Sequence, residues 1–168
     1  MELRPQDVLV ALKLAVSDCR GCHQQAIARE LGISAGELSK SLQRLRASQL
    51  VSESELRTLR SPFMEFIKHG LRYVLPVKRR GITRGLPTAY AAAPLRDRIV
   101  SDGIVPPVWA DPDGQVNGEA WEPLSNSAVG AAKRNERMYQ GLALIDAIRG
   151  GRARERALAE EYLRALTA

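Results

Sequence analysis

The side chains best suited to metal binding or redox reactions lie together in Cys19-Arg20-Gly21-Cys22-His23. The C-x-x-C-H spacing fits a c-type haem attachment site, part of a zinc site or a redox-active dithiol. We reject the haem interpretation, because such attachment takes place outside the cytoplasm and the sequence predicts no export signal. A structural zinc ion needs four ligands, and only one histidine outside the motif, His69, is available. Plain loop residues are the favoured interpretation, and an oxidisable thiol pair is the alternative.

A second pattern places polar and small residues on one side of a predicted helix over Ser34–Ala47. Hydroxyl, amide and ammonium groups on such a face can read base edges in the DNA major groove. Arg44 and Arg46 lie further along and are expected to contact phosphates, which position a protein on DNA without specifying sequence. The candidate residues for the start of the helix and for base reading are Ser34, Ala35, Gly36, Ser39, Lys40 and Gln43.

A third pattern is a basic, glycine-bracketed stretch that we expect to be a mobile loop. Its cations are Lys78, Arg79, Arg80 and Arg84. They could grip the DNA backbone or enter a minor groove. A solvated loop or a docking site for an acidic protein is the alternative.

No group of residues has usable spacing for catalysis or for a metal or cofactor site. Asp111 and Asp113 belong to a turn sequence, Asp-Pro-Asp-Gly, and are interpreted as turn formers. No Ser-His-Asp or Cys-His arrangement stands out, so we expect no enzyme activity and no cofactor.

The elements that must position the reading residues follow from local signals. Ile27, Ala28 and Leu31 have helical spacing, and Gly32 is suited to end that helix. Ser34 and Glu37 fit a capping box at the start of the next helix. The inward face of that second helix is formed by Leu38, Leu42 and Leu45. An ordinary helical hairpin in a core is the alternative to a helix-turn-helix.

The run from Ala28 to Val51 resembles the winged helix-turn-helix of MarR-like bacterial regulators. It matches the pattern I-A-x-x-L-G-x-S-x-x-x-(V/L)-S-x-x-L-x-x-L followed by Leu-Val. The sequence departs from the pattern at Gln49, where such proteins usually have glycine, and it lacks an obvious long wing. The resemblance implies double-stranded DNA as the partner and a homodimer on a palindromic site.

Outside this motif the sequence predicts helices beginning at Pro5 and at Ser61-Pro62, the latter ending near His69-Gly70. Tyr73-Val74-Leu75 is predicted as a short strand. A β-hairpin is predicted around Asp111–Gly114, with Trp109 and Trp121 anchoring it to the core.

The overall prediction is a mainly α protein of 168 residues in three segments. Residues 1–75 form the winged helix-turn-helix domain, 76–125 the basic loop and an irregular Pro/Gly-rich segment, and 126–168 C-terminal helices that dimerise or pack on the same chain. The net charge of +6 is concentrated in residues 61–100, which carry eight basic and two acidic residues. Such a distribution suits a polyanion partner. No apolar run approaches the ~20 residues of a membrane span, and the expected location is the cytoplasm.

From the sequence we therefore expect a sequence-specific DNA-binding transcriptional regulator. The alternative is a protein-interaction module, such as the antitoxin-like partner of a neighbouring gene product. That alternative would depend on Trp109, Trp121 or the end helices.

Overall fold

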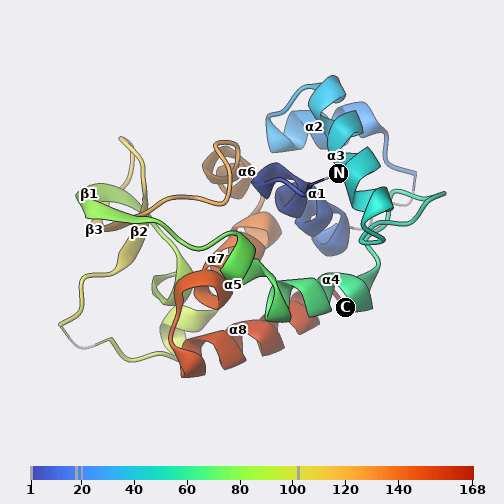
Figure 1. Cartoon of the computed structure of the whole chain (residues 1–168). Coiled ribbons are helices and arrows are strands. Elements are labelled where there is room, and N and C mark those ends of the chain that lie inside the picture. The colour runs from blue at the N-terminus through green and yellow to red at the C-terminus, as the bar shows by residue number, and fades with distance from the viewer. Residues whose placement is uncertain (1, 18, 20, 102) are drawn as a thin grey trace.

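The computed structural model describes residues 2–17, 19, 21–101 and 103–168 of the chain. Helices dominate it and one small sheet accompanies them, which confirms the predicted fold class (Figure 1). The helices are α1 (Pro5–Val16), α2 (Gln24–Leu31), α3 (Ala35–Ala47), α4 (Arg60–His69), α5 (Leu71–Val74), α6 (Ala128–Arg134), α7 (Glu136–Gly150) and α8 (Ala153–Leu166). The strands are β1 (Arg79–Pro87), β2 (Pro107–Ala110) and β3 (Val116–Trp121), and short 3-10 turns cover Ala89–Ala91 and Leu95–Asp97.

Helix α7 lies at the centre of the molecule. Residues 141–149 are all buried, so this helix has no solvent-facing stripe along most of its length. Gly141 allows α1 to approach closely, because a Cβ atom at this position would lie 2.9 Å from Cδ1 of Leu12. The most N-terminal helix therefore packs directly against a helix from the last third of the chain.

One hydrophobic core joins the three predicted segments. It runs without interruption from residues of α1 to residues of α8, such as Ala159 and Leu163. Arg137 of α7 also links the ends of α1 and α8, because it donates hydrogen bonds to the carbonyl oxygens of Val16 (2.8 Å) and Leu166 (2.6 Å). The C-terminal helices thus pack back on the same chain.

The sheet is attached to α7 through a buried carboxylate. Asp146 accepts hydrogen bonds from the Thr88 hydroxyl (2.8 Å), the Trp109 indole (2.7 Å) and Arg149 (2.9 Å). Burial raises the pKa of Asp146, and the neighbouring Arg149 guanidinium opposes that rise. Trp109 and Trp121 are 1% and 4% exposed, so their predicted role as core anchors is confirmed.

Two short predictions in the middle of the chain are wrong. Residues 73–75 do not form a strand: Leu71–Val74 forms the helical turn α5. Gly70 keeps a right-handed helical conformation (φ −112°, ψ −42°), so it does not end the helical path after α4. The basic stretch is not a loop either, since Arg79, Arg80 and Arg84 lie in β1, which pairs with both other strands.

The predicted β-hairpin is wrong in its pairing. Asp111–Gly114 forms the expected turn, and Asp111 accepts a hydrogen bond from the Asp113 backbone N–H (3.0 Å). The strands on either side run parallel to each other, and each pairs antiparallel with β1. Gly118 makes this arrangement feasible, because a Cβ atom there would collide with the carbonyl oxygen of Pro106.

Gln49 has a left-handed backbone conformation (φ 57°), directly after the last turn of α3. This conformation explains why glycine suits the position, since a side chain with a Cβ atom is strained there. We predict that Gln49→Gly raises the free energy of unfolding by about 0.5–1 kcal/mol, measured by urea denaturation. Ala47→Gly is the control, because it removes a helix-favouring residue and should lower stability by up to about 1 kcal/mol. Equal destabilisation by both changes would contradict the prediction.

Candidate nucleic-acid interface

Helices α2 and α3, with a short turn between them, lie where the sequence predicts the two helices of the helix-turn-helix motif. Gly32 ends α2 in the left-handed conformation (φ 68°, ψ 33°). The Ser34 hydroxyl accepts a hydrogen bond from the Glu37 backbone N–H (3.2 Å), and the Glu37 carboxylate accepts one from the Ser34 backbone N–H (2.7 Å). These bonds hold the pKa of Glu37 below its ordinary value. The ionised carboxylate therefore stabilises the fold at pH values above the ordinary pKa, and this stabilisation is lost as the pH falls through the lowered pKa.

The two faces of α3 separate as the sequence predicts. Leu38, Leu42 and Leu45 are at most 1% exposed and pack into the core. The predicted start and base-reading residues all lie on the solvent side and are exposed: Ser34, Ala35, Gly36, Ser39, Lys40 and Gln43. The inner face of the helix is therefore held by the core, while its outer face is available to a partner.

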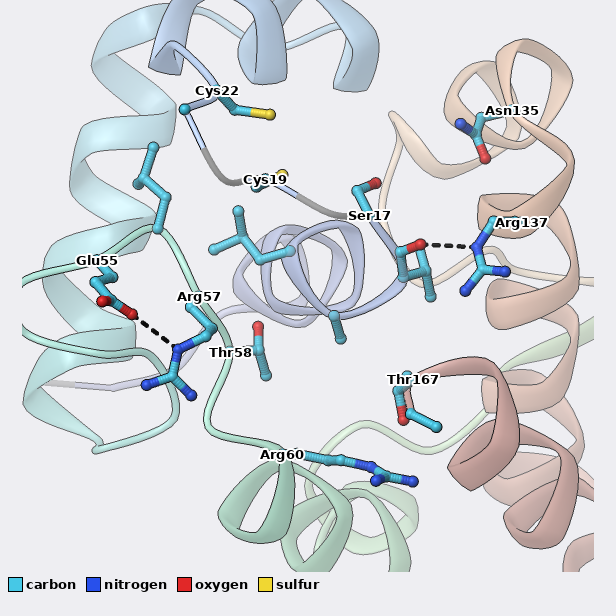
Figure 2. Close-up of a pocket in the computed structure, with 16 residues that line it drawn as sticks. Ser17, Cys19, Cys22, Glu55, Arg57, Thr58, Arg60, Asn135, Arg137 and Thr167 are labelled. Carbon is cyan, nitrogen blue, oxygen red and sulfur yellow. Dashed lines mark hydrogen bonds and ion pairs between the residues drawn. The ribbon is translucent and has the colours of Figure 1, made fainter.

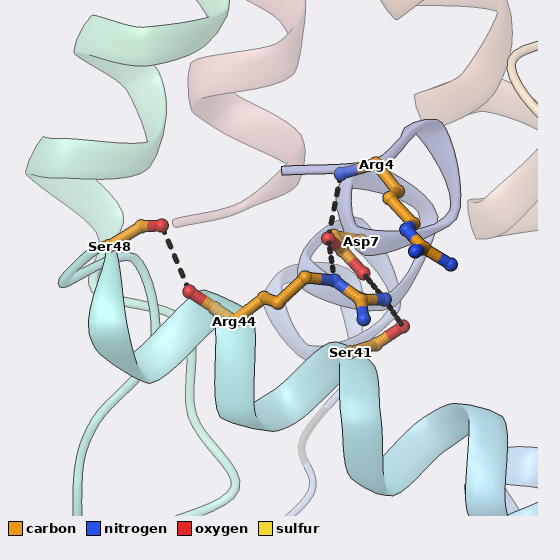
Figure 3. Close-up of polar contacts among 5 residues, drawn as sticks. All are labelled: Arg4, Asp7, Ser41, Arg44 and Ser48. Carbon is orange, nitrogen blue, oxygen red and sulfur yellow. Dashed lines mark hydrogen bonds and ion pairs between the residues drawn. The ribbon is translucent and has the colours of Figure 1, made fainter. Parts of the chain in front are cut away.

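Arg44 has a different environment from the one expected of a phosphate contact. Its guanidinium forms a two-point ion pair with Asp7 of α1, with both nitrogen–oxygen distances 2.7 Å (Figure 3). The Asp7 side chain is fully buried and that of Arg44 is 13% exposed. Asp7 also accepts a hydrogen bond from the Arg4 backbone N–H (2.8 Å) at the start of α1. We assign Arg44 a structural role, which is to fix α3 against α1.

Two further charged contacts hold α2, and sequence reasoning missed both. Lys13, which is buried in α1, forms an ion pair with Glu30. Arg134 of α6 donates a hydrogen bond to the Glu30 carbonyl oxygen (2.8 Å) at the end of α2. A cation near the C-terminal end of a helix is stabilising, and here it comes from a distant part of the chain. Nothing in the local sequence pattern could have indicated this partner.

The segment after α3, residues 51–58, is a short turn closed by one isolated β-bridge, and we call it the wing. Val51 pairs with Thr58, and the Ser52 backbone N–H donates to the Arg57 carbonyl oxygen (2.9 Å). The Thr58 hydroxyl donates to the Ala11 carbonyl oxygen (2.6 Å), which fixes the base of the wing to α1. Arg46, one of the predicted phosphate contacts, is half-buried and donates to the Ser52 carbonyl oxygen (3.3 Å).

A groove of about 600 Å³ separates α3 from the wing. Its lining includes Ser39, Gln43 and Arg46 from α3 and Glu53 from the wing. Glu53 and Glu55 make the wing tip acidic, and Arg57 is paired with Glu55 (2.9 Å). Residues 24–57 carry five basic and four acidic side chains, so this surface has little net charge.

The basic strand β1 lies far from α3. Figure 1 shows β1 and α3 at opposite ends of the molecule, with α1, α6 and α7 between them. Arg80 donates to the Glu122 carboxylate (2.8 Å), while Arg79 stacks on the Trp121 ring at 5.0 Å and donates to the Gly150 carbonyl oxygen. Lys78 and Arg84 are exposed. The structure therefore does not bring the two predicted groups of DNA contacts to one face.

The Asp7–Arg44 ion pair gives a direct stability prediction. Asp7→Asn should lower the free energy of unfolding by about 3 kcal/mol, because it leaves a largely buried guanidinium without its counter-charge. The double variant with Arg44→Gln should cost less than the sum of the two single changes, as measured by a double-mutant cycle in urea.

Glu55→Gln is the matched control, since it breaks the exposed pair with Arg57, whose side chains are 63% and 61% exposed. That change should cost no more than about 1 kcal/mol. If Asp7→Asn costs no more than Glu55→Gln, the ion pair does not fix α3.

Comparison of the chain with protein families, curated proteins and solved structures yields no match. A functional assignment therefore has to start from the geometry of α2, α3 and the wing.

Proposed function

We propose that this protein is a sequence-specific DNA-binding transcriptional regulator that inserts α3 into the major groove. The observation that carries the proposal is the two-sided character of α3. Its leucine face is buried and locked to α1, while its polar face is exposed from the N-terminal cap to Gln43. A helix that reads bases needs this combination of a fixed orientation and a free polar face.

Each exposed residue has a distinct expected role. Ser39 and Gln43 would read base edges, and Lys40 would contact a guanine edge or a phosphate. The exposed start of the helix at Ala35 and Gly36 would approach the DNA backbone with its N–H groups. Arg44 is excluded from this set because Asp7 holds its guanidinium.

The charge of the surface shapes the expected salt dependence. Because residues 24–57 are nearly neutral, few phosphates would be contacted through α2, α3 and the wing. Affinity should then fall less steeply with salt than for a strongly basic DNA-binding protein. Specificity would come mainly from base contacts.

We further infer a cytoplasmic homodimer on a two-fold symmetric site. Helix α7 is buried within one chain, so the dimer contact would use other surfaces, including the exposed side of α8. Among the described residues, no helix has the length and apolar character needed to cross a membrane.

The first test is fluorescence anisotropy with the DNA directly upstream of the gene and with random DNA, at two salt concentrations. Wild type should bind the upstream DNA more tightly than random DNA. Gln43→Ala should remove about 1–3 kcal/mol of that preference. Lys40→Gln should reduce the slope of log affinity against log salt by about one if the lysine contacts a phosphate.

Gln115→Ala is the matched control, because Gln115 is also an exposed glutamine but lies outside the helix-turn-helix, directly before β3. It should leave binding unchanged. Weak, equal binding to all DNA that Gln43→Ala does not alter would overturn the proposal.

The acidic wing favours a second candidate, a protein-interaction module. Glu53, which unlike Glu55 is not paired with Arg57, would repel DNA phosphates, whereas β1 presents basic residues and an Ile82 side chain that is 67% exposed. Since Trp109 and Trp121 are buried, an acidic partner would dock on this strand. Co-elution with the product of a neighbouring gene that is lost in Lys78→Glu/Arg84→Glu but kept in Gln43→Ala would support this candidate.

A further inference from the structure

The connection between α1 and α2 brings two thiols together. The Cys22 backbone N–H donates to the Cys19 carbonyl oxygen (3.1 Å), which closes a tight turn between the two residues. Both side chains are half-buried, and no disulfide joins them. Figure 2 shows the two side chains near one another on this connection, and the neighbouring Cys22 thiol raises the pKa of Cys19.

The thiols line a groove of about 1250 Å³ through which a small molecule can reach them. The end of α1, the base of the wing and the C-terminal end of α8 contribute the other walls, for example through Ser17, Arg57 and Thr167 (Figure 2). Among the residues that the structure describes, no three His, Cys, Asp or Glu side chains gather into a metal site.

The two sulfurs have unequal surroundings. Burial, followed by the influence of the neighbouring Cys22 thiol, raises the pKa of Cys19 to about 12. Cys22 lies two residues before α2 begins at Gln24 and lines the same groove as Cys19. Cys19 thus keeps its proton at neutral pH, and Cys22 is left as the nucleophile.

We propose that Cys19 and Cys22 form a redox-active dithiol that hydroperoxides oxidise, with Cys22 attacked first and Cys19 closing the disulfide. The inference goes beyond the proposed function and does not depend on it, because it rests on the proximity of the two thiols.

The chemistry balances in two steps. The Cys22 thiolate attacks one peroxide oxygen, the O–O bond breaks, and the departing oxygen takes a proton and leaves as water or an alcohol, which gives a sulfenic acid on Cys22. The Cys19 sulfur then attacks the Cys22 sulfur, the S–O bond breaks, and the hydroxyl leaves as water with the Cys19 proton. In total two thiols are oxidised by two electrons and one hydroperoxide is reduced.

The test treats the folded protein with hydrogen peroxide, then denatures it in N-ethylmaleimide and measures its intact mass. Wild type should lose two hydrogens and take up no N-ethylmaleimide. Cys19→Ser should accumulate a sulfenic acid on Cys22 that dimedone traps. Cys22→Ser should react more slowly than Cys19→Ser, because burial favours the protonated form of the remaining Cys19 thiol.

Urea supplies the control, because the unfolded chain keeps the C-x-x-C spacing but loses the groove. In urea the rates of the two single variants should converge. Should either variant fail to fold, early dimedone labelling of wild type, located by peptide mapping, should fall on Cys22.

Three results would overturn the proposal. Wild type could keep two alkylatable thiols after peroxide treatment. The disulfide could join two chains, as non-reducing electrophoresis would reveal. Cys22→Ser could react as fast as Cys19→Ser in the folded state.

Discussion

The ion pair between Asp7 and Arg44 is the constraint on which the candidate DNA-binding surface depends. A buried carboxylate is stable only when it is paired and hydrogen-bonded, and Asp7 has both kinds of partner. Because the pair has two nearly parallel bonds, it fixes the rotation of α3 as well as its distance from α1. The exposed face of α3 is therefore set by an interaction on the side of the helix that a partner would never touch.

The rest of the chain supports that arrangement from behind. Helix α7 fills the space beneath α1, Arg134 holds the end of α2, and Thr58 holds the base of the wing. In this protein the helix-turn-helix is thus one face of a larger core. The sheet is attached to the same core through Asp146 and lies at the opposite end of the molecule (Figure 1).

The sequence predicted those elements whose signals are local. The cap at Ser34, the left-handed Gly32 and the leucine face of α3 each follow from residues within one or two turns, and the structure has all three. The failures involve contacts between distant residues. The strand assignment of 79–87 depends on β2 and β3, whose residues follow some 20 to 40 positions later. Likewise, the sequence pattern predicts a phosphate contact at Arg44, because the pattern does not show that Asp7, 37 residues earlier, is its ion-pair partner. Pattern reasoning found the candidate surface but could not identify which of its cations are already neutralised.

The contacts of Arg137 and Gly141 have a consequence for how the protein is synthesised. Leu12 of α1 packs against Gly141 of α7, and the hydrogen bond from Arg137 to Val16 spans 121 positions in the chain. A ribosome adds residues one at a time, so α1 cannot pack against α7 until most of the chain has emerged. During that interval the side of α1 that packs on α7 stays uncovered, although α2 and α3, which contact another side of α1, are already complete. The helix-turn-helix therefore acquires its final support last, and its folding is governed by contacts of high sequence separation.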